Sequence, residues 1–207
     1  MLPIQQQEAE LSGPIIHYFF VQSPWSFFGF RRAVDIAKKN GVEIIHKPCR
    51  AADVWQHGGG VPVSKRPKPR QDYRLVELKR WSKHLKIPIH LHPAHFPIDE
   101  TFAARTIIAV QEDGKDVTGL TDTLMGDVWL RERDISDPNT VREALVSNHL
   151  SVEYLEYADM PHTAQIYDEN CQSARERNVF GVPTYFVGDE MFWGQDRLAF
   201  VDMALRT

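Results

Sequence analysis

A strand–helix–strand pattern in the first fifty residues constrains the fold more than any other feature of the chain. Two largely apolar runs, residues 15–21 and 42–49, flank a segment with helical periodicity, residues 26–40. In that segment one face carries apolar side chains, and Asn40-Gly41 marks a C-terminal stop. The short links predict a βαβ unit with parallel strands, and the near-continuous apolar character of the first run suits burial on both faces.

More strands are predicted at the other end of the chain. Residues 183–187 and 191–193, joined by Gly-Asp-Glu, indicate a hairpin, and residues 194–205 follow as a helix. Between the two ends, residues 51–70 predict a loop rich in Gly, Pro and basic residues, and residues 72–177 are mostly helical in pattern. An α/β sheet split as βαβ…ββα, with an inserted all-helical domain, is the simplest account.

This pattern divides the chain into three parts. We expect residues 1–14 to be a disordered leader, and residues 15–50 together with 179–207 to form the sheet domain. Residues 51–178 then form the helical insertion and its connecting helix.

Composition narrows the classes of protein that this chain can be. The formal net charge of −4 provides no positive field for nucleic acid, and no apolar run approaches the ~20 residues that span a bilayer. Cys49 and Cys171 are far apart and in no metal-type spacing, which favours a reducing compartment. The N-terminus lacks a basic segment followed by an apolar one and is not a secretory signal, so we expect a cytoplasmic protein.

Ser23 stands where the first strand turns into the first helix, within Ser23-Pro24-Trp25-Ser26. A helix N-terminus favours negative charge, and a hydroxyl there can donate to an anion. The structural alternative is a plain N-cap, for which Ser23 and Ser26 compete. An acyl-transfer role for Ser23 is disfavoured because no Gly-x-Ser-x-Gly elbow surrounds it.

The second candidate feature is "FGVPT", in which Val182-Pro183 comes just before a buried strand and is followed by Thr184. A cis bond there would turn the Val182 backbone toward the Ser23 turn, where it could pair with a peptide-like ligand. The alternative is a trans proline that starts a strand.

Further charged and polar candidates lie in three segments. Gln195 and Asp196 open the last predicted helix, where Asp196 either binds a ligand ammonium or complements the helix dipole. The basic loop 64–70 is either a solvated loop or a clamp for carboxylates. His90 and His92 suggest a metal site, but Pro93 and the lack of nearby acids argue against it, so we expect no metal.

Several segments together resemble one family: "FFVQSPWSFF", "YRLVELKRW", "KIPIHLHPAHFP", "VWLRERDISDP" and "VFGVPTYFVGDEMFWGQDRL". The family is the 2-hydroxychromene-2-carboxylate isomerases, which are related to kappa-class glutathione transferases and DsbA-like oxidoreductases. The resemblance covers nearly the whole chain. It implies a thioredoxin-like fold with an inserted helical domain, a homodimer, and glutathione as the cofactor.

The resemblance also implies roles for residues of the candidate turns. Ser23 would lie beside the glutathione sulfur, Val182 and Pro183 would contact the cysteinyl backbone, and Asp196 would contact the γ-glutamyl end. Neighbouring residues complete the predicted cofactor site: Thr184 and Gln195.

Four residues are predicted to face a small aromatic carboxylate substrate: Trp25, Ser64, Lys65 and Phe96. Here the chain departs from the family pattern, which can place Asn-Arg at Ser64-Lys65 and Tyr at Phe96. The cofactor site is therefore better supported than the particular substrate.

The implied reaction is the isomerisation of 2-hydroxychromene-2-carboxylate to trans-o-hydroxybenzylidenepyruvate, or of a related aromatic catabolite, as in naphthalene degradation. The thiol that the turn lacks would arrive with glutathione, and Ser23 would hold the thiolate without attacking the substrate itself. Two alternatives stay open. One is a kappa-like glutathione transferase or peroxidase, and the other is a non-catalytic DsbA-like module that binds extended peptides.

Overall fold

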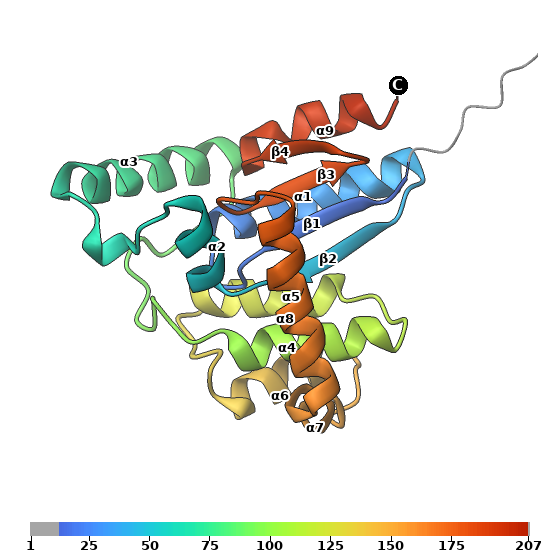
Figure 1. Cartoon of the computed structure of the whole chain (residues 1–207). Coiled ribbons are helices and arrows are strands. Elements are labelled where there is room, and N and C mark those ends of the chain that lie inside the picture. Colours follow the sequence, from blue (N-terminus) through green and yellow to red (C-terminus); the bar gives the residue numbers. More distant parts are fainter. Residues whose placement is uncertain (1–12, 207) are drawn as a thin grey trace, which may run out of the picture.

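The structure, a computed structural model, describes residues 13–206, so the predicted leader lies outside it apart from Gly13 and Pro14. A four-stranded sheet has the order β2-β1-β3-β4 (Figure 1). Strand β1 (Ile15–Phe19) pairs in parallel with β2 (Ile44–Pro48), and helix α1 (Pro24–Asn40) connects them. This confirms the predicted βαβ unit.

The C-terminal strands complete the sheet as predicted. Strand β3 (Thr184–Val187) runs antiparallel to β1, and β4 (Glu190–Trp193) pairs antiparallel with β3 after a tight turn at Gly188. The last predicted helix divides into a short 3-10 turn, η2 (Gln195–Arg197), and α9 (Leu198–Ala204). Asp196 therefore lies in the 3-10 turn and not in the first turn of an α-helix.

Between β2 and β3 the chain is helical. The helices with their bounds are α2 (Ala51–Gly58), η1 (Val63–Lys65), α3 (Lys68–Leu85), α4 (Thr101–Glu112), α5 (Thr118–Trp129), α6 (Pro138–Ser147), α7 (Tyr154–Asp159) and α8 (Pro161–Glu176). The split sheet and the helical insertion confirm the predicted fold class, a thioredoxin-like α/β fold. Among residues 13–206, no helix is both long and apolar enough to cross a bilayer.

The prediction of a loop over residues 51–70 was wrong for its first part. Residues 51–58 form α2, whose Val54 is fully buried and whose Trp55 packs edge-on against Phe20. Gly59 ends the helix in the left-handed conformation, with φ 69°. The glycines that favoured a loop thus act as a helix stop, and tertiary burial stabilises the helix before it.

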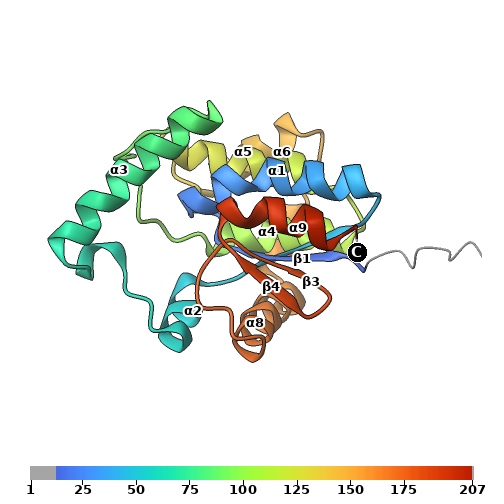
Figure 2. The ribbon, with the colours of Figure 1, turned by 90° about the horizontal axis from the view of Figure 1, so that it is seen from above.

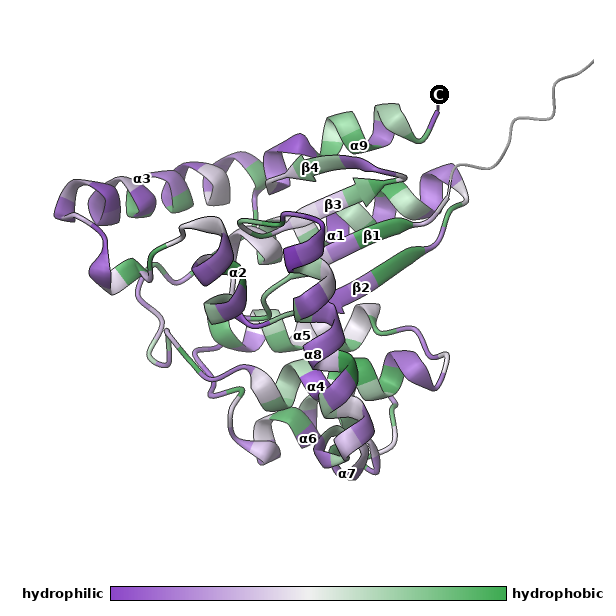
Figure 3. Cartoon of the chain, viewed as in Figure 1, coloured by the Kyte–Doolittle hydropathy of each residue, from purple (hydrophilic) through white to green (hydrophobic). Residues whose placement is uncertain are grey.

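Helices cover both faces of the sheet, as the two views in Figures 1 and 2 show. Successive side chains of a strand point to opposite faces. Tyr185 accordingly packs with the residues of α1 and α9, and Phe186 packs with Cys171 and Ala174 of α8. Figure 3 shows the apolar beginnings of β1 and β2 and the mostly polar character of α3.

Candidate active site

The Ser23 turn begins the first helix. Ser23 is the N-cap of α1, and its Oγ accepts a hydrogen bond from the Ser26 backbone N–H at 3.2 Å. The Ser23 side chain is nearly buried, with 6% exposed. Within residues 13–206 its hydroxyl hydrogen has no acceptor. The cap and the donor role are therefore compatible, because the cap uses a lone pair and leaves the O–H free.

Ser26, the other candidate cap, has a different environment. It is fully buried, and its Oγ has no hydrogen-bond partner among the described residues. Ser23 thus caps the helix and Ser26 does not.

A partly buried polar clamp fixes the residue before Ser23. The Gln22 side-chain amide donates to the Ile98 carbonyl at 2.8 Å and accepts from the Ile98 N–H at 3.1 Å. The Gln22 backbone N–H donates to Glu100 Oε2 at 2.8 Å. Burial raises the pKa of Glu100 to about 7, and the hydrogen bonds from Gln22 oppose that rise. Sequence reasoning missed this clamp, since its members lie far apart in the chain.

The segment before β3 faces the same region. The Val182–Pro183 peptide bond, identified in the sequence as a candidate cis bond, is cis. The Pro183 carbonyl accepts from the Gly194 N–H at 2.9 Å, and the Thr184 hydroxyl donates to the Gly181 carbonyl at 2.7 Å. In the described part of the chain, the backbone N–H and C=O of Val182 have no partner. They can therefore pair with an extended ligand.

Gln195 and Asp196 differ in their availability. Gln195 is buried, and its Oε1 accepts from Arg32 Nη1 at 2.5 Å. Its side chain therefore links η2 to α1. Asp196 is partly exposed and pairs with its neighbour Arg197 at 2.6 Å. Such an exposed pair is weak, at about 0–1 kcal/mol, so the carboxylate can exchange Arg197 for a ligand cation.

A cavity of about 230 Å³ brings several predicted residues together. Its lining consists of Trp25, Trp81, Val182, Trp193, Gly194, Gln195, Asp196 and Arg197. Ligand pockets usually measure ~300–1,000 Å³, so a longer ligand would extend out of this cavity. Ser23 lies two residues from Trp25, at the base of the same turn, while Pro183 and Thr184 continue from Val182 into β3.

Two tryptophans of this cavity were not predicted. Trp193 is half-exposed and packs edge-on against Phe180, with ring centroids 4.7 Å apart. Gly181 must stay small there, because a Cβ would lie 2.6 Å from Trp193 Nε1. Trp81 comes from α3. Both lie in segments that resemble the family, Trp193 within "VFGVPTYFVGDEMFWGQDRL" and Trp81 at the end of "YRLVELKRW", but neither was assigned to the site.

The predicted substrate residues do not all meet at this cavity. Trp25 lines it, but Ser64 and Lys65 are exposed on η1 and are not among its lining residues. Phe96 packs against Trp129, with ring centroids 5.0 Å apart, and does not line the cavity either.

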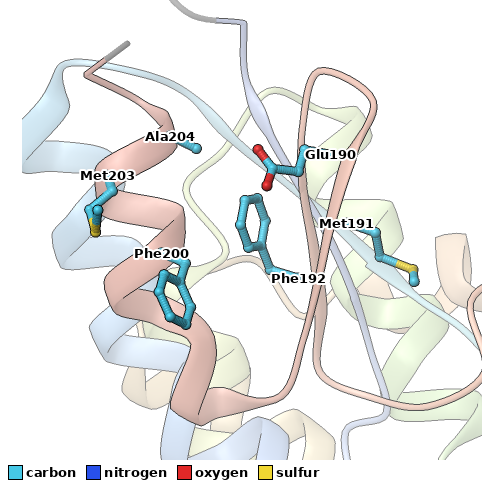
Figure 4. A pocket seen from close by; sticks show the side chains of 6 residues that line it. All are labelled: Glu190, Met191, Phe192, Phe200, Met203 and Ala204. Carbon is cyan, nitrogen blue, oxygen red and sulfur yellow. The ribbon is translucent and has the colours of Figure 1, made fainter.

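A larger hollow of about 430 Å³ lies elsewhere, between β4 and α9 (Figure 4). Phe192 projects into it from β4 and Phe200 from α9. Glu190 is its only ionisable lining residue, and none of the predicted site residues lines it. We therefore assign the site to the smaller cavity at the Ser23 turn. In residues 13–206 no cluster of three or more His, Cys, Asp or Glu side chains could hold a metal ion.

Comparison with known proteins agrees with this fold. The family model of the DsbA-like thioredoxin domain matches residues 14–206. The 2-hydroxychromene-2-carboxylate isomerase of Pseudomonas putida is 31% identical over 194 residues, which cover 91% of this chain and 92% of that protein. The isomerase of the same name from Pseudomonas sp. (strain C18) is 31% identical over 190 residues, with 91% and 88% covered.

A solved structure of a 2-hydroxychromene-2-carboxylate isomerase superposes with a TM-score of 0.75 at 28% identity, over 93% of this chain and 94% of that one. Sequence and structure thus match over nearly the full length of both proteins. The chain belongs to the 2-hydroxychromene-2-carboxylate isomerase family, within the DsbA-like thioredoxin proteins.

Proposed function

We propose that this isomerase depends on glutathione and interconverts 2-hydroxychromene-2-carboxylate and trans-o-hydroxybenzylidenepyruvate, or a closely related aromatic catabolite. One observation carries the proposal. The Ser23 hydroxyl caps α1 through its oxygen and keeps its hydrogen free, in the same turn as the cavity-lining Trp25. A free O–H at a helix N-terminus stabilises a thiolate, by hydrogen bonding and by the helix dipole.

The chain's own thiols do not suit this chemistry. Cys49 and Cys171 are both buried and free. Burial raises the pKa of Cys171 to about 11, and it also raises the pKa of Cys49. Neither thiol ionises near neutral pH, so a thiolate at the Ser23 turn has to come from a bound molecule.

The residues present fit glutathione. The unpaired backbone groups of Val182 can bind its cysteinyl backbone as a short strand, and Asp196 at the rim can bind the α-ammonium of its γ-glutamyl end. Gln195 supports this end indirectly, since its bond to Arg32 holds η2 against α1. When bound, glutathione would supply a thiolate that adds reversibly to a conjugated double bond, which allows the bond to rotate.

Each residue then has a limited task in the reaction. Ser23 would donate to the sulfur of the bound glutathione and keep it ionised. Trp25 and Trp81 present flat apolar surfaces to an aromatic ring of the substrate. The clamp at Gln22 holds the Ser23 turn in place. A homodimer and a cytoplasmic location stay predictions from the family resemblance and the composition.

The decisive experiment is equilibrium binding of glutathione, followed through the ultraviolet absorbance of the thiolate across pH. We expect saturable binding with an apparent thiol pKa well below its free value of ~8.5. S-methylglutathione, which cannot ionise at sulfur, should bind without the thiolate signal. Absence of binding at millimolar glutathione would refute the proposal and favour a module that binds extended peptides at Val182.

A further inference from the structure

One arginine of α3 occupies an unusual position. The guanidinium carbon of Arg74 lies 5.2 Å from the ring centroid of Phe96 and 5.9 Å from that of Trp129. The side chain is partly buried, on a helix whose other residues are mostly polar (Figure 3). Leu78 and Trp81, four and seven positions later, share its helix face, so Arg74 points to the same side as the cavity-lining Trp81.

Arg74 has no acidic partner. Within residues 13–206 it forms neither an ion pair nor a hydrogen bond with a carboxylate, and the charged group that acts on it most is Arg66. Burial, and then the positive charge of Arg66, lowers the pKa of Arg74 to about 10, so the side chain stays protonated at neutral pH. Burial, and then the positive charge of Arg70, lowers the pKa of Arg66 in turn.

A partly buried cation among like charges is unfavourable unless something compensates it. The two aromatic rings supply part of the compensation, since each cation–π contact contributes about 0.5–2 kcal/mol. Both rings lie toward one side of the guanidinium, since their centroids are only 5.0 Å apart, and its edge, with five N–H donors, has no hydrogen-bond partner in the described chain. That edge matches a carboxylate, which it can bind through two parallel hydrogen bonds.

The guanidinium edge of Arg74 is linked to the turn that carries Ser23 through one side chain. Trp129, which lies under Arg74, donates its Nε1–H to the Gln22 carbonyl at 3.2 Å, and Gln22 precedes Ser23. One side chain therefore connects the unpaired cation to the turn that holds the sulfur.

Neighbouring cations are less suited to this task. Lys65 is exposed on η1, Lys68 pairs with Asp72, and Arg66 donates its Nε–H to the Val61 carbonyl at 2.7 Å. Arg74 alone among these four cations is held against apolar rings without a polar partner in the described chain.

We propose that Arg74 is the substrate-binding residue that selects a carboxylate, and that Arg66 adds to the attraction at longer range. The identity of the ligand as an aromatic carboxylate rests on the proposed function. The assignment replaces Lys65, which the family pattern favoured, with a residue on the next helix.

The test is calorimetric titration with a matched pair of probes, trans-cinnamate and trans-cinnamamide, which share the ring and the double bond and differ in charge. We expect the wild type to bind cinnamate at least tenfold more tightly, since a charge-assisted bidentate contact is worth that much or more. Arg74→Met, which keeps an unbranched stem in the helix, should abolish the preference while changing cinnamamide binding less than threefold. Arg74→Lys should keep part of the preference for cinnamate, because lysine has the positive charge but not the planar guanidinium that binds a carboxylate through two hydrogen bonds.

Lys79→Met is the matched control, since it removes an exposed positive charge from the same helix and should leave the preference intact. The inference is overturned if the wild type shows no preference for cinnamate, or if Arg74→Met retains that preference. An equal loss of affinity for both probes in Arg74→Met would mean that Arg74 only supports packing, and this result would also overturn the inference. Thiolate titration of Arg74→Met separates the two proposals, because an unchanged glutathione signal leaves the cofactor site intact whatever happens to cinnamate.

Discussion

His17 of β1 and His46 of β2 face each other in register, with their Nδ1 atoms 3.0 Å apart and both side chains buried. One Nδ1 must carry the hydrogen while the other accepts it, and burial favours the neutral form of both rings. His17 is also stacked between Phe19 and Tyr185, at centroid distances of 4.9 and 4.8 Å. Protonation of these two buried histidines at low pH should therefore destabilise the folded protein.

Burial lowers the pKa of His17 well below 6.5 and that of His46 to about 4. Below pH 6.5 the unfolded chain binds protons that the folded chain does not, so the free energy of unfolding falls as the pH drops from 6.5 toward 4. The slope can reach about 2.7 kcal/mol per pH unit for two protons. Urea unfolding at several pH values measures it, and His17→Phe, which removes one of the two protons, should have a shallower slope. Equal slopes would contradict the role of the pair.

Glu100 should act in the opposite direction. Its pKa is raised from 4.5 to about 7, so the folded chain retains a proton that the unfolded chain loses, and stability falls as the pH rises through this range. Glu100→Gln keeps an acceptor for the Gln22 N–H and removes the titration. Its free energy of unfolding relative to wild type should rise by up to about 1.4 kcal/mol per pH unit between pH 4.5 and 7. A difference that does not vary with pH would refute this.

Two measurements on one Ser23 variant distinguish its role as a helix cap from its role as a hydrogen-bond donor: the free energy of unfolding and the pKa of bound glutathione. Ser23→Ala removes both the cap and the free O–H, and loss of a cap costs about 1 kcal/mol. If Ser23 donates to a thiolate, the pKa of bound glutathione should also rise, with a fall in turnover of tenfold or more. Ser26→Ala is the matched control, since the buried Ser26 hydroxyl has no partner in the described residues. A stability loss at unchanged thiol pKa would leave Ser23 with the cap alone.

Gly29 sets the distance between α1 and the sheet. A Cβ there would lie 2.5 Å from Tyr185 Oη and 3.1 Å from Gln195 Cβ. Alanine normally stabilises a helix by up to about 1 kcal/mol over glycine. We expect Gly29→Ala to destabilise instead, by about 1–3 kcal/mol, since both neighbours are buried and must shift. Thermal unfolding gives the sign, and a stabilised variant would contradict the packing described here.

Local sequence determines the features that were predicted well. The βαβ unit and the hairpin are both indicated by patterns of neighbouring residues within one strand, helix or turn. Ser23 and Val182 could be identified because a strand end and an X–Pro bond are both local signals. The structure adds the positions of Ser23 and Val182 relative to the cavity.

What the sequence did not predict depends on contacts between distant segments. Helix α2 forms because Val54 and Trp55 find buried partners, in a stretch whose composition favours a loop. Trp81 meets Trp25 at the cavity because the insertion folds back onto the first helix, and Arg74 meets Trp129 because α3 and the end of α5, both in the insertion, come together. Periodicity identifies the face of a helix but not the element that it will contact.

The way the insertion joins the sheet has a consequence for how such a protein can acquire new substrates. The chain leaves the sheet after β2 and returns at β3, and of the residues lining the cavity Trp81 is the one that the insertion supplies. Substitutions at Arg74 or Trp81 would alter what the cavity accepts while the hydrogen-bond ladder of the sheet stays as it is. A single surface helix could then be varied in a combinatorial library, with the rest of the protein serving as a constant platform.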